Sequence, residues 1–411
     1  MATENNNKTL NVPNLRFPEF SGEWEKTTLG NIGETFNGLT GKSSADFGQG
    51  SPYITYKSIF DNSRIDLSRV ELVTITDQER QKGTQNKVQY GDIFFTTSSE
   101  TPEEVGMTSV LLDDIEDCYL NSFCFGYRLY SKEHILPEYM RFYLRTQGVR
   151  KKLFVLAQGS TRFNISKGEV MNVSVAIPEI KEQEKIAKFL SLLEERIDTQ
   201  IKIIEDLKKL KSAISKQIFV QKPICWNRLE TLFIKGKAGG TPTSTNKDYY
   251  NGEIPFLSIN DITKQGKYIR YTENHLSQSG LDNSSAWVVP AHSLIMSMYA
   301  SVGLVTINEI PIATSQAMFA MQLKDKGLLD YLYYYLSYFK YRHIHKYLET
   351  GTQSNINADI VRSIMIPDYG HERNIEIAST LQSIDAKIDN ELSVLEQFNK
   401  QKNYLLSQMF I

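Results

Sequence analysis

The reactive side chains of this 411-residue sequence do not stand at the spacings of a catalytic or metal site. No GxxxxGK(S/T) phosphate-binding loop occurs, and the glycine pair at 239–240 leads to Pro242, which has no backbone N–H to offer a phosphate. HExxH, GxSxG and the N/D-P-P-aromatic quartet of amino-methyltransferases are also missing from the sequence. His343 and His345 are two residues apart in a helical pattern and do not share a face. We therefore expect no catalytic residue, no metal ligand and no cofactor-binding residue in this chain.

Positive charge is concentrated in one stretch of the sequence. Residues 140–168 contain Lys, Arg, Phe and Tyr residues but no Asp or Glu. The cations are Arg141, Arg145, Arg150, Lys151, Lys152, Arg162 and Lys167. The tract includes a Gly/Ser/Thr/Asn loop at 159–164, and a similar polar loop stands at 351–355. This pattern predicts contacts with DNA phosphates and, from the loops, with base edges. A solvated helix face followed by a turn is the alternative interpretation.

The composition limits the class of protein. The 46 Lys and Arg residues nearly balance 48 Asp and Glu residues, so DNA contact must come from local patches. With 41% hydrophobic and 23% charged residues, the chain is typical of a globular protein, and roughly 150 residues per domain predicts two or three domains. Three cysteines without a CxxC fit a reducing compartment. No signal-peptide pattern occurs, and no apolar run approaches the roughly 18 residues of a membrane span. We expect a cytoplasmic protein without membrane contact.

A long internal repeat indicates which elements would position the loops. Residues 186–219 align with residues 377–410 at a constant offset of 191, without gaps. Apolar residues recur every three or four positions in both copies, which predicts two long amphipathic helices. Because such a helix needs a partner along its length, we expect the copies to pair as a coiled coil or two-helix bundle. The alternative is that each helix packs only on its own domain.

The repeat continues upstream in weaker form. An aromatic helix pattern from Leu136 corresponds to one from Leu328, and residues 51–59 correspond to residues 254–262, where a proline precedes a strand pattern. Strands precede helices in each half, which favours an α+β fold with two similar mixed α/β globules over a doubly wound sheet. We expect an N-terminal segment at 1–22, a first domain at 23–180, a long helix at 181–222, a second domain at 223–368 and a C-terminal long helix at 369–411.

These blocks together resemble the specificity subunit of type I restriction–modification systems. The resemblance rests on LRFPEFSGEW at 15–24, GGTPTSTNKDYYNGEIPFLSINDI at 239–262, the two polar loops before a proline and the paired long helices, and it covers nearly the whole chain. The first half has Leu-Thr-Gly-Lys at 39–42 where the second half has Gly-Gly-Thr-Pro. Base-reading positions therefore do not transfer between the halves.

The resemblance implies a fold and a division of labour. Two target-recognition domains would each read one part of a bipartite site in double-stranded DNA, in the major groove. Two antiparallel long helices would set the unread spacer and give a pseudo-twofold internal repeat. The subunit itself would not be an enzyme and would bind no cofactor. Two methyltransferase subunits would modify adenine with S-adenosylmethionine, and restriction (motor) subunits using ATP and Mg would join for cleavage.

Polar side chains on loops and strand ends of both domains are the candidates for reading bases, with phosphate contacts from the basic tract. The candidate DNA-binding residues of the first domain are Thr55, Lys57, Thr97, Ser98, Arg150, Lys151, Lys152, Gln158, Ser160, Thr161, Arg162 and Asn164. Those of the second domain are Thr241, Ser258, Asn260, Tyr299, Thr352, Gln353 and Asn355. The alternative for a Thr or Ser at a strand end is a turn or cap role.

The sequence alone leaves other functions open. The chain could be the recognition subunit of a two-subunit system whose partner both methylates and cleaves, or a coiled-coil scaffold whose duplicated domains bind proteins or peptides. An autonomous DNA methyltransferase is disfavoured, because the sequence has neither the cofactor loop nor the catalytic quartet. The DNA sequence recognised, the spacer length and the stoichiometry do not follow from the sequence.

Overall fold

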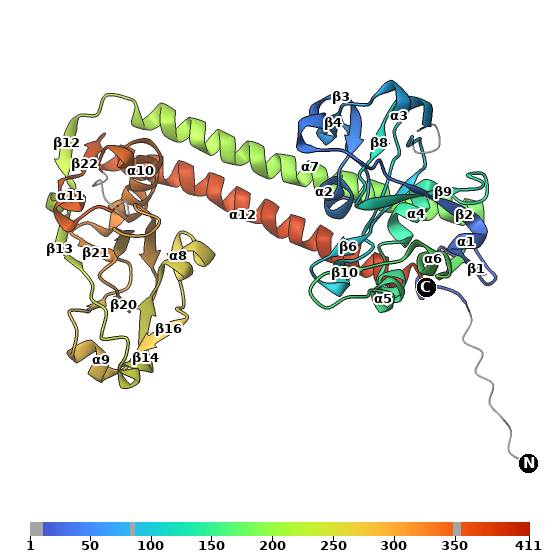
Figure 1. Ribbon diagram of the computed structural model, residues 1–411. Helices are drawn as coiled ribbons and strands as arrows, with labels where there is room; N and C mark the ends of the chain where they lie inside the picture. The colour runs from blue at the N-terminus through green and yellow to red at the C-terminus, as the bar shows by residue number, and fades with distance from the viewer. Residues whose placement is uncertain (1–10, 83–86, 348–354) are drawn as a thin grey trace, which may run out of the picture. The chain divides into compact units, whose positions relative to one another are not determined.

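The computed structural model describes residues 11–82, 87–347 and 355–411, and the chain divides into two units (Figure 1). Unit 1 contains Met1–Gln200 and Val394–Ile411, and unit 2 contains Ile201–Ser393. Each unit therefore holds one end of both long helices. The domain boundaries expected from the sequence instead follow the change from globule to helix.

Unit 1 is an α+β structure built on two sheets. Its strands are β1 (Glu25–Thr28), β2 (Gly33–Asn37), β3 (Phe47–Ile54), β4 (Glu71–Val73), β5 (Ile93–Thr96), β6 (Ser98–Ser99), β7 (Thr108–Val110), β8 (Tyr119–Leu120), β9 (Cys124–Leu129), β10 (Phe163–Asn164) and β11 (Ser174–Ile177). The larger sheet has the order β2-β9-β5-β7, and the smaller sheet has the order β4-β3-β8 with β3 and β8 parallel. Two further ladders pair β1 with β11 and β6 with β10.

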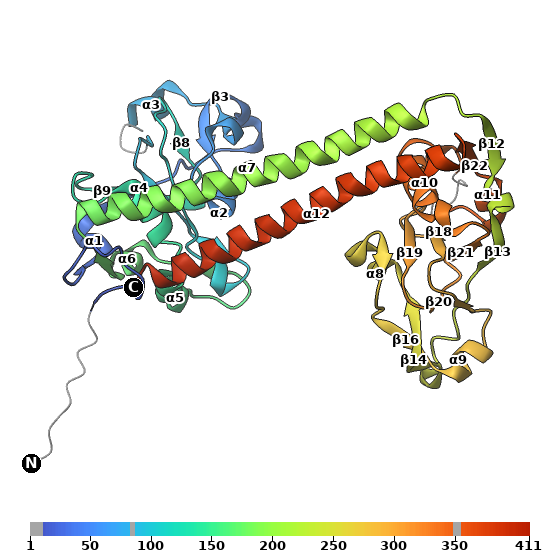
Figure 2. The ribbon, with the colours of Figure 1, turned by 180° about the vertical axis from the view of Figure 1, so that it is seen from behind.

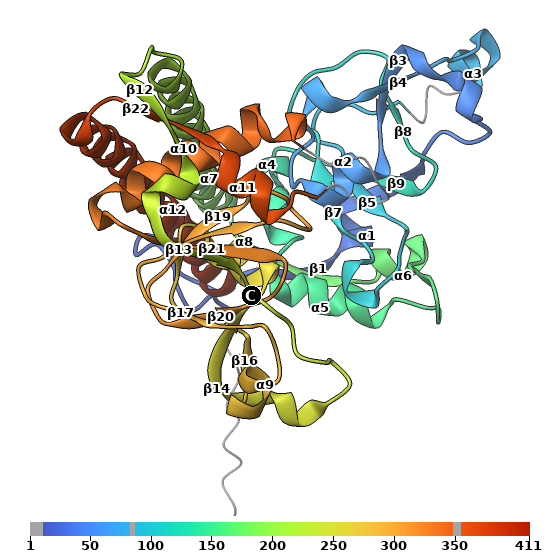
Figure 3. The same cartoon turned by 90° about the vertical axis from the view of Figure 1, so that its left-hand side faces the viewer.

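Unit 2 repeats this arrangement. Its strands are β12 (Cys225–Arg228), β13 (Phe233–Ala238), β14 (Tyr250–Leu257), β15 (Tyr268–Ile269), β16 (Asn274–Leu276), β17 (Val288–Val289), β18 (Leu294–Ser297), β19 (Val305–Asn308), β20 (Ile312–Thr314), β21 (Met318–Leu323) and β22 (Met365–Asp368). The larger sheet has the order β13-β21-β18-β19-β15, the smaller has the order β16-β14-β20-β17, and β12 pairs with β22. Figure 3 shows β14 and β16 at the end of unit 2 away from the β12–β22 ladder. The two halves thus share a common strand order, as the upstream repeat predicts, and unit 2 has one more strand in each sheet, β15 in the larger and β17 in the smaller.

The helices follow the sequence patterns with one difference between the units. They are α1 (Leu29–Ile32), α2 (Tyr56–Asp61), α3 (Asp77–Lys82), α4 (Pro137–Tyr143), α5 (Gln147–Val155), α6 (Lys167–Met171), α7 (Ile180–Phe219), α8 (Ile259–Gln265), α9 (Gln278–Asp282), α10 (Leu329–Arg342), α11 (Ala358–Ser363) and α12 (His371–Gln408). The aromatic pattern forms one continuous helix in unit 2, α10. In unit 1 it breaks after Tyr143 into α4 and α5, because Thr146, at the N-cap position of α5, leaves the helical conformation with ψ 153°.

The long helices α7 and α12 pack antiparallel within each unit, as Figures 1 and 2 show. In unit 1, Leu193 near the start of α7 shares a core with Leu405 near the end of α12. In unit 2, Ile218 near the end of α7 shares a core with Ile377 near the start of α12. The predicted pairing of the two helices is confirmed.

A phenylalanine at or just beyond the end of each long helix packs on the aromatic helix of the unit that the long helix enters. Phe410, two residues beyond α12, lies 5.6 Å from Tyr139 and 5.9 Å from Tyr143, measured between ring centroids. Phe219 of α7 contacts α10 in the same way, with its ring 5.2 Å from that of Tyr335. Both phenylalanines are 6% exposed. The repeat therefore extends to the way each helix pair is joined to its globule.

Candidate nucleic-acid interface

A short helix follows the long strand of the smaller sheet in each unit, and a candidate residue caps it. Thr55 is the N-cap of α2, and its hydroxyl accepts a hydrogen bond from the Ser58 N–H at 3.3 Å. Ser258 is the N-cap of α8 and forms a capping box with Asp261. Because an N-cap oxygen satisfies a helix N–H that would otherwise have no partner, both side chains have a structural role. Contact between either residue and DNA stays a prediction.

Three segments that are distant in sequence meet at one surface of unit 1. The Tyr56 hydroxyl of α2 donates to the Ser98 carbonyl at 2.7 Å, and the Thr97 hydroxyl donates to the Phe123 carbonyl at 2.6 Å. The ladder between β6 and β10 sets Ser98 opposite Asn164. Asn164 is exposed here, whereas Ser98 is only 8% exposed. The structure thus brings α2, β6 and the polar loop of the first domain together.

The polar loop between α5 and β10 is a tight hairpin with an exposed tip. Gln158 and Asn164 exchange two backbone hydrogen bonds, at 2.8 and 2.9 Å. Gly159 has a φ of 142°, and a Cβ there would lie 2.1 Å from the Arg162 carbonyl oxygen, so this turn requires glycine. The Ser-Thr-Arg tip at 160–162 is exposed. It offers two hydroxyls and a guanidinium, groups that suit phosphates and base edges.

Unit 2 has the same junction between its loops but different side chains. Ile356 donates its N–H to the Met298 carbonyl at 3.0 Å, as Ile165 does to the Thr97 carbonyl in unit 1. Tyr299, which follows Met298, is 40% exposed. A large aromatic ring therefore stands in unit 2 near the place that small hydroxyl side chains hold in unit 1.

The other candidates of unit 2 are spread over several segments. Thr241 and Asn260 are exposed, and the Asn260 amide donates to Glu273 at 2.8 Å. Thr352 and Gln353 lie outside the described residues. Asn355 is half-buried at the start of the next described segment. The structure joins Asn355, through Ile356, to the strand that leads into Tyr299.

Three arginines of the basic tract are half-buried and make their contacts within unit 1, and phosphate contact by Arg150 stays a prediction. Arg150 donates to backbone carbonyls in the turn 103–106, each at 2.6 Å: those of Glu103, Val105 and Gly106. Arg145 also donates to backbone carbonyls, at 2.6 to 3.2 Å: those of Ile59, Phe60, Asn62 and Thr108. Arg141 forms an ion pair with Glu194. Burial lowers the pKa of each of these arginines to about 10, which still leaves them protonated at neutral pH.

The physical reason for the burial of Arg145 is the end of α2. The last carbonyls of a helix have no partner inside the helix, and a guanidinium carries five N–H donors in one plane. The Arg145 guanidinium therefore donates to the carbonyls at the end of α2 and, through the Thr108 carbonyl, links this helix to β7. Arg145 and Arg150 therefore support the segments next to the candidate loops from the interior of unit 1.

The exposed cations of the tract are fewer than its sequence suggests. Lys151 and Arg162 are exposed, and Lys57 is exposed on α2. Lys152 is exposed too, although its ammonium group donates to the Ser174 carbonyl at 2.7 Å. Phosphate contact by these four side chains stays a prediction.

The sequence reasoning missed the internal arginines and the residues that they hold. A signal was present, since Arg141 and Arg145 are four residues apart and share one face of an aromatic helix. In unit 2 the same helix has Tyr333 and Ser337 at the aligned positions. A difference of this kind between the aligned halves indicates that the two units have different interior contacts at these positions.

Within the ranges that the structure describes, no group of three or more His, Cys, Asp or Glu side chains could hold a metal ion. In the same ranges, no helix has the length and apolar character needed to cross a bilayer.

The chain is similar to proteins of one family along nearly its whole length. The family model described as the type I restriction modification DNA specificity domain matches it twice, at residues 21–209 and 226–399. A relative named as the type I restriction enzyme MjaX specificity subunit, from Methanocaldococcus jannaschii, is 25% identical over 97% of this chain and 96% of its own. The type I restriction enzyme HindI specificity subunit of Haemophilus influenzae is 34% identical over 23% of this chain and 20% of its own.

Solved structures show the same fold. The S subunit of a type I restriction–modification system from M. genitalium superposes with a TM-score of 0.58, at 14% identity, over 97% of this chain and 99% of that one. The HsdS subunit of Thermoanaerobacter tengcongensis gives a TM-score of 0.50, at 16% identity, over 94% and 96% of the two chains. Two similar α+β domains with long helices are therefore the architecture of this chain, as expected from its sequence.

Proposed function

The chain belongs to the family of type I restriction–modification DNA specificity domains, and we propose that it gives such a complex its DNA sequence specificity. Each unit would read one part of a bipartite site in double-stranded DNA. The observation that supports this proposal best is the pair of units with a common strand order and different exposed side chains at their polar loops. Two copies of a scaffold with unlike surfaces suit the reading of two unlike half-sites.

Chemistry would belong to the partners of this chain. We propose that two methyltransferase subunits bind the chain and use S-adenosylmethionine, and that restriction subunits use ATP and Mg for translocation and cleavage. The chain itself would hold no cofactor. Its contribution to catalysis would be positional, because joining two half-site interactions in one molecule raises the effective concentration of the second after the first has formed.

One experiment tests the specificity role directly. The chain is co-expressed with the products of its neighbouring genes in a host without DNA methylation, and modified adenines are mapped by single-molecule sequencing. We expect one bipartite motif with a fixed spacer. The control host carries the neighbouring genes alone and should show no such motif. Modification that does not depend on this chain, or that follows a single undivided motif, would contradict the proposal.

A second experiment tests whether the helices set the spacer. Inserting four residues in the middle of α7 adds about 6 Å and slightly more than one turn. We expect a changed spacer or a loss of assembly. The matched control inserts the same residues after Gln221, in the connection beyond α7, where the helix pairing stays intact. Methylation of the original site at the normal rate by the α7 variant would disprove the role of helix length.

A further inference from the structure

In unit 1, polar contacts connect a long helix to the segment that leaves α2. Glu194 of α7 pairs with Arg141 of α4, and the Arg141 Nε donates to the Ser63 hydroxyl at 3.0 Å. Ser63 follows Asn62, which is the C-cap of α2. We call these three residues the unit 1 junction. It runs from the long helix, through the aromatic helix, to the exit of the short helix at the candidate DNA surface.

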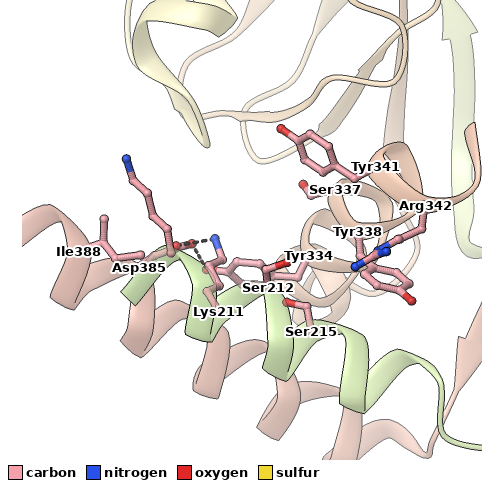
Figure 4. A pocket seen from close by; sticks show the side chains of 11 residues that line it. Lys211, Ser212, Ser215, Tyr334, Ser337, Tyr338, Tyr341, Arg342, Asp385 and Ile388 are labelled. Carbon is pink, nitrogen blue, oxygen red and sulfur yellow. Dashed lines mark hydrogen bonds and ion pairs between the residues drawn. The ribbon is translucent and has the colours of Figure 1, made fainter. Parts of the chain in front are cut away.

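Unit 2 contains a junction between the same elements. The Tyr334 hydroxyl of α10 donates to Asp385 of α12 at 2.8 Å and accepts a hydrogen bond from Lys267 at 3.1 Å. Lys267 follows Gly266, which is the C-cap of α8. Figure 4 shows Tyr334 and Lys211 pointing toward Asp385. Asp385, Tyr334 and Lys267 form the unit 2 junction.

The junctions occupy equivalent places in the repeat. Glu194 and Asp385 are separated by the repeat offset of 191 residues. The carbonyls of Ser63 and Lys267 each accept a hydrogen bond from an N–H of the equivalent strands β7 and β19. The order of the contacting groups differs between the units. From the long helix outward, the contacts in unit 1 run from acid to cation to hydroxyl, and those in unit 2 run from acid to hydroxyl to cation. An acid at this position of the long helix is what the two have in common.

Each acid also joins the two long helices. Lys402 of α12 pairs with Glu194 at 2.6 Å in unit 1, and Lys211 of α7 pairs with Asp385 at 2.5 Å in unit 2. These lysines are again separated by the repeat offset. The carboxylates are only 17% and 25% exposed, so their contacts are partly shielded from water. Three elements therefore meet at one carboxylate in each unit.

The unit 2 junction is reachable from solvent. A cavity of about 530 Å³ between α7, α10 and α12 is lined by Lys211, Tyr334 and Asp385, together with the exposed Tyr341 (Figure 4). Tyr334 itself is only 3% exposed and belongs to the hydrophobic core of unit 2, so a substitution there has to keep the ring and remove the hydroxyl alone. Such a substitution can separate a positioning role from a contribution to stability.

We propose that Glu194 and Asp385 are positioning residues for DNA reading. Each carboxylate fixes the exit of a short helix, α2 or α8, to the long helices through the aromatic helix between them. The orientation of each candidate DNA surface then follows the long helices to which it is tied. This inference rests on the proposed function of the chain and adds residues that do not themselves contact DNA.

The test compares two substitutions that each remove one partner of Asp385. Tyr334→Phe deletes one oxygen and breaks the junction, while the ion pair between Lys211 and Asp385 stays. Phenylalanine is also the residue at the aligned position 142 of unit 1, so the size of the side chain suits the fold. Lys211→Met is the matched control, because it removes the ion pair between the long helices and keeps the bond from Tyr334.

The measurement is competitive binding by the co-expressed methyltransferase complex to DNA with single base changes in one half-site at a time. We expect Tyr334→Phe to reduce discrimination about tenfold at one half-site and to leave the other unchanged, as the loss of a hydrogen bond to a charged group implies. Lys211→Met should leave discrimination unchanged at both. In unit 1, Ser63→Ala should reduce discrimination at the opposite half-site only.

The outcomes distinguish a failure of the proposed function from a failure of the positioning role. If the wild-type complex reads no bipartite site, the proposed function of the chain fails. If the wild-type complex reads such a site and Tyr334→Phe keeps full discrimination, the positioning role alone fails. An equal loss at both half-sites would also overturn the positioning role, because a general loss of stability would produce that result.

Discussion

The two units share the order of their strands but support their candidate DNA surfaces with different chemistry. In unit 1, Arg145 and Arg150 reach through the interior to backbone carbonyls of α2 and of the turn 103–106. In unit 2, the aligned helix α10 is continuous and has Ser337 at the position of Arg145. Its buried Tyr331 and Tyr335 align with Tyr139 and Tyr143 of unit 1, which are buried as well, so the difference between the helices lies at the arginine positions.

This difference shows at which equivalent positions the two units keep the same type of residue and at which they do not. The interiors differ where unit 1 has Arg141 and Arg145, because unit 2 has Tyr333 and Ser337 at the aligned positions. The acid of each junction, the lysine that pairs with it and the terminal phenylalanine have stayed in type. The constrained features are those that attach a globule to the helices. Substitutions at equivalent positions of the two units therefore test whether those positions have the same structural role.

The largest effect is expected at the terminal phenylalanines. Phe410→Ala and Phe219→Ala each remove a buried ring, and each should cost about 3–5 kcal/mol of unfolding free energy in its own unit. Hydrogen exchange followed by mass spectrometry would locate the loss of protection in α4 for the first variant and in α10 for the second. If only one of the two substitutions is costly, the equivalence of these contacts is wrong.

The second-largest effect is expected where unit 1 has Arg145 and unit 2 has Ser337. Arg145→Met leaves several carbonyls of α2 and β7 without their donor, and we expect a cost of about 3 kcal/mol with faster amide exchange in α2. The matched substitution in unit 2, Ser337→Ala, changes a half-buried position and should stay within about 0.5 kcal/mol. Similar costs for the two variants would show that the interiors do not differ as described.

A smaller effect concerns DNA binding by the exposed part of the basic tract. Lys151→Glu should weaken binding to all DNA sequences alike and lower the salt slope by about 1, because one phosphate contact is lost. Lys188→Glu is the control, since this exposed lysine belongs to α7 and not to a polar loop. A salt titration in which both variants match the wild type would remove Lys151 from the DNA surface.

The smallest effect is a pH dependence confined to unit 1. Hydrogen bonds from Lys42 and from Thr76 lower the pKa of Glu79 to about 2. Because this folded-state pKa lies below the ordinary value near 4.5, the contribution is complete above pH 4.5 and is lost as the pH falls toward 2. For this partly exposed pair we expect at most about 1 kcal/mol. Acid titration of unit 1 stability in Glu79→Gln should lack this component, and an unchanged titration would contradict it.

Much of the fold follows from the sequence because it depends on local patterns and on the repeat. The long helices were predicted at 181–222 and 369–411, and the structure has them at Ile180–Phe219 and His371–Gln408. The differences have local causes. Pro223 stands just beyond the end of α7, and Gly370, with a φ of 94°, separates β22 from the start of α12.

The candidate site follows from the sequence only in part. The composition of residues 159–164 predicts a polar loop, and the structure places its tip in solvent. The burial of Arg145 could not be predicted, because its carbonyl partners lie 37 to 86 residues away in the chain. Whether a cation faces water or a distant carbonyl is decided by tertiary packing, which a local charge count does not contain.

The division of the long helices between the units has a consequence for synthesis. Unit 2 is one continuous stretch of chain, whereas the core of unit 1 includes Leu405, Met409 and Phe410 from the last residues of the sequence. During translation, unit 2 can fold before Phe410 has been added, and until then Trp24 and Tyr139 lack their contact with the Phe410 ring. Unit 1 therefore begins first in the chain but completes its aromatic core only after residues 405–410 have been added.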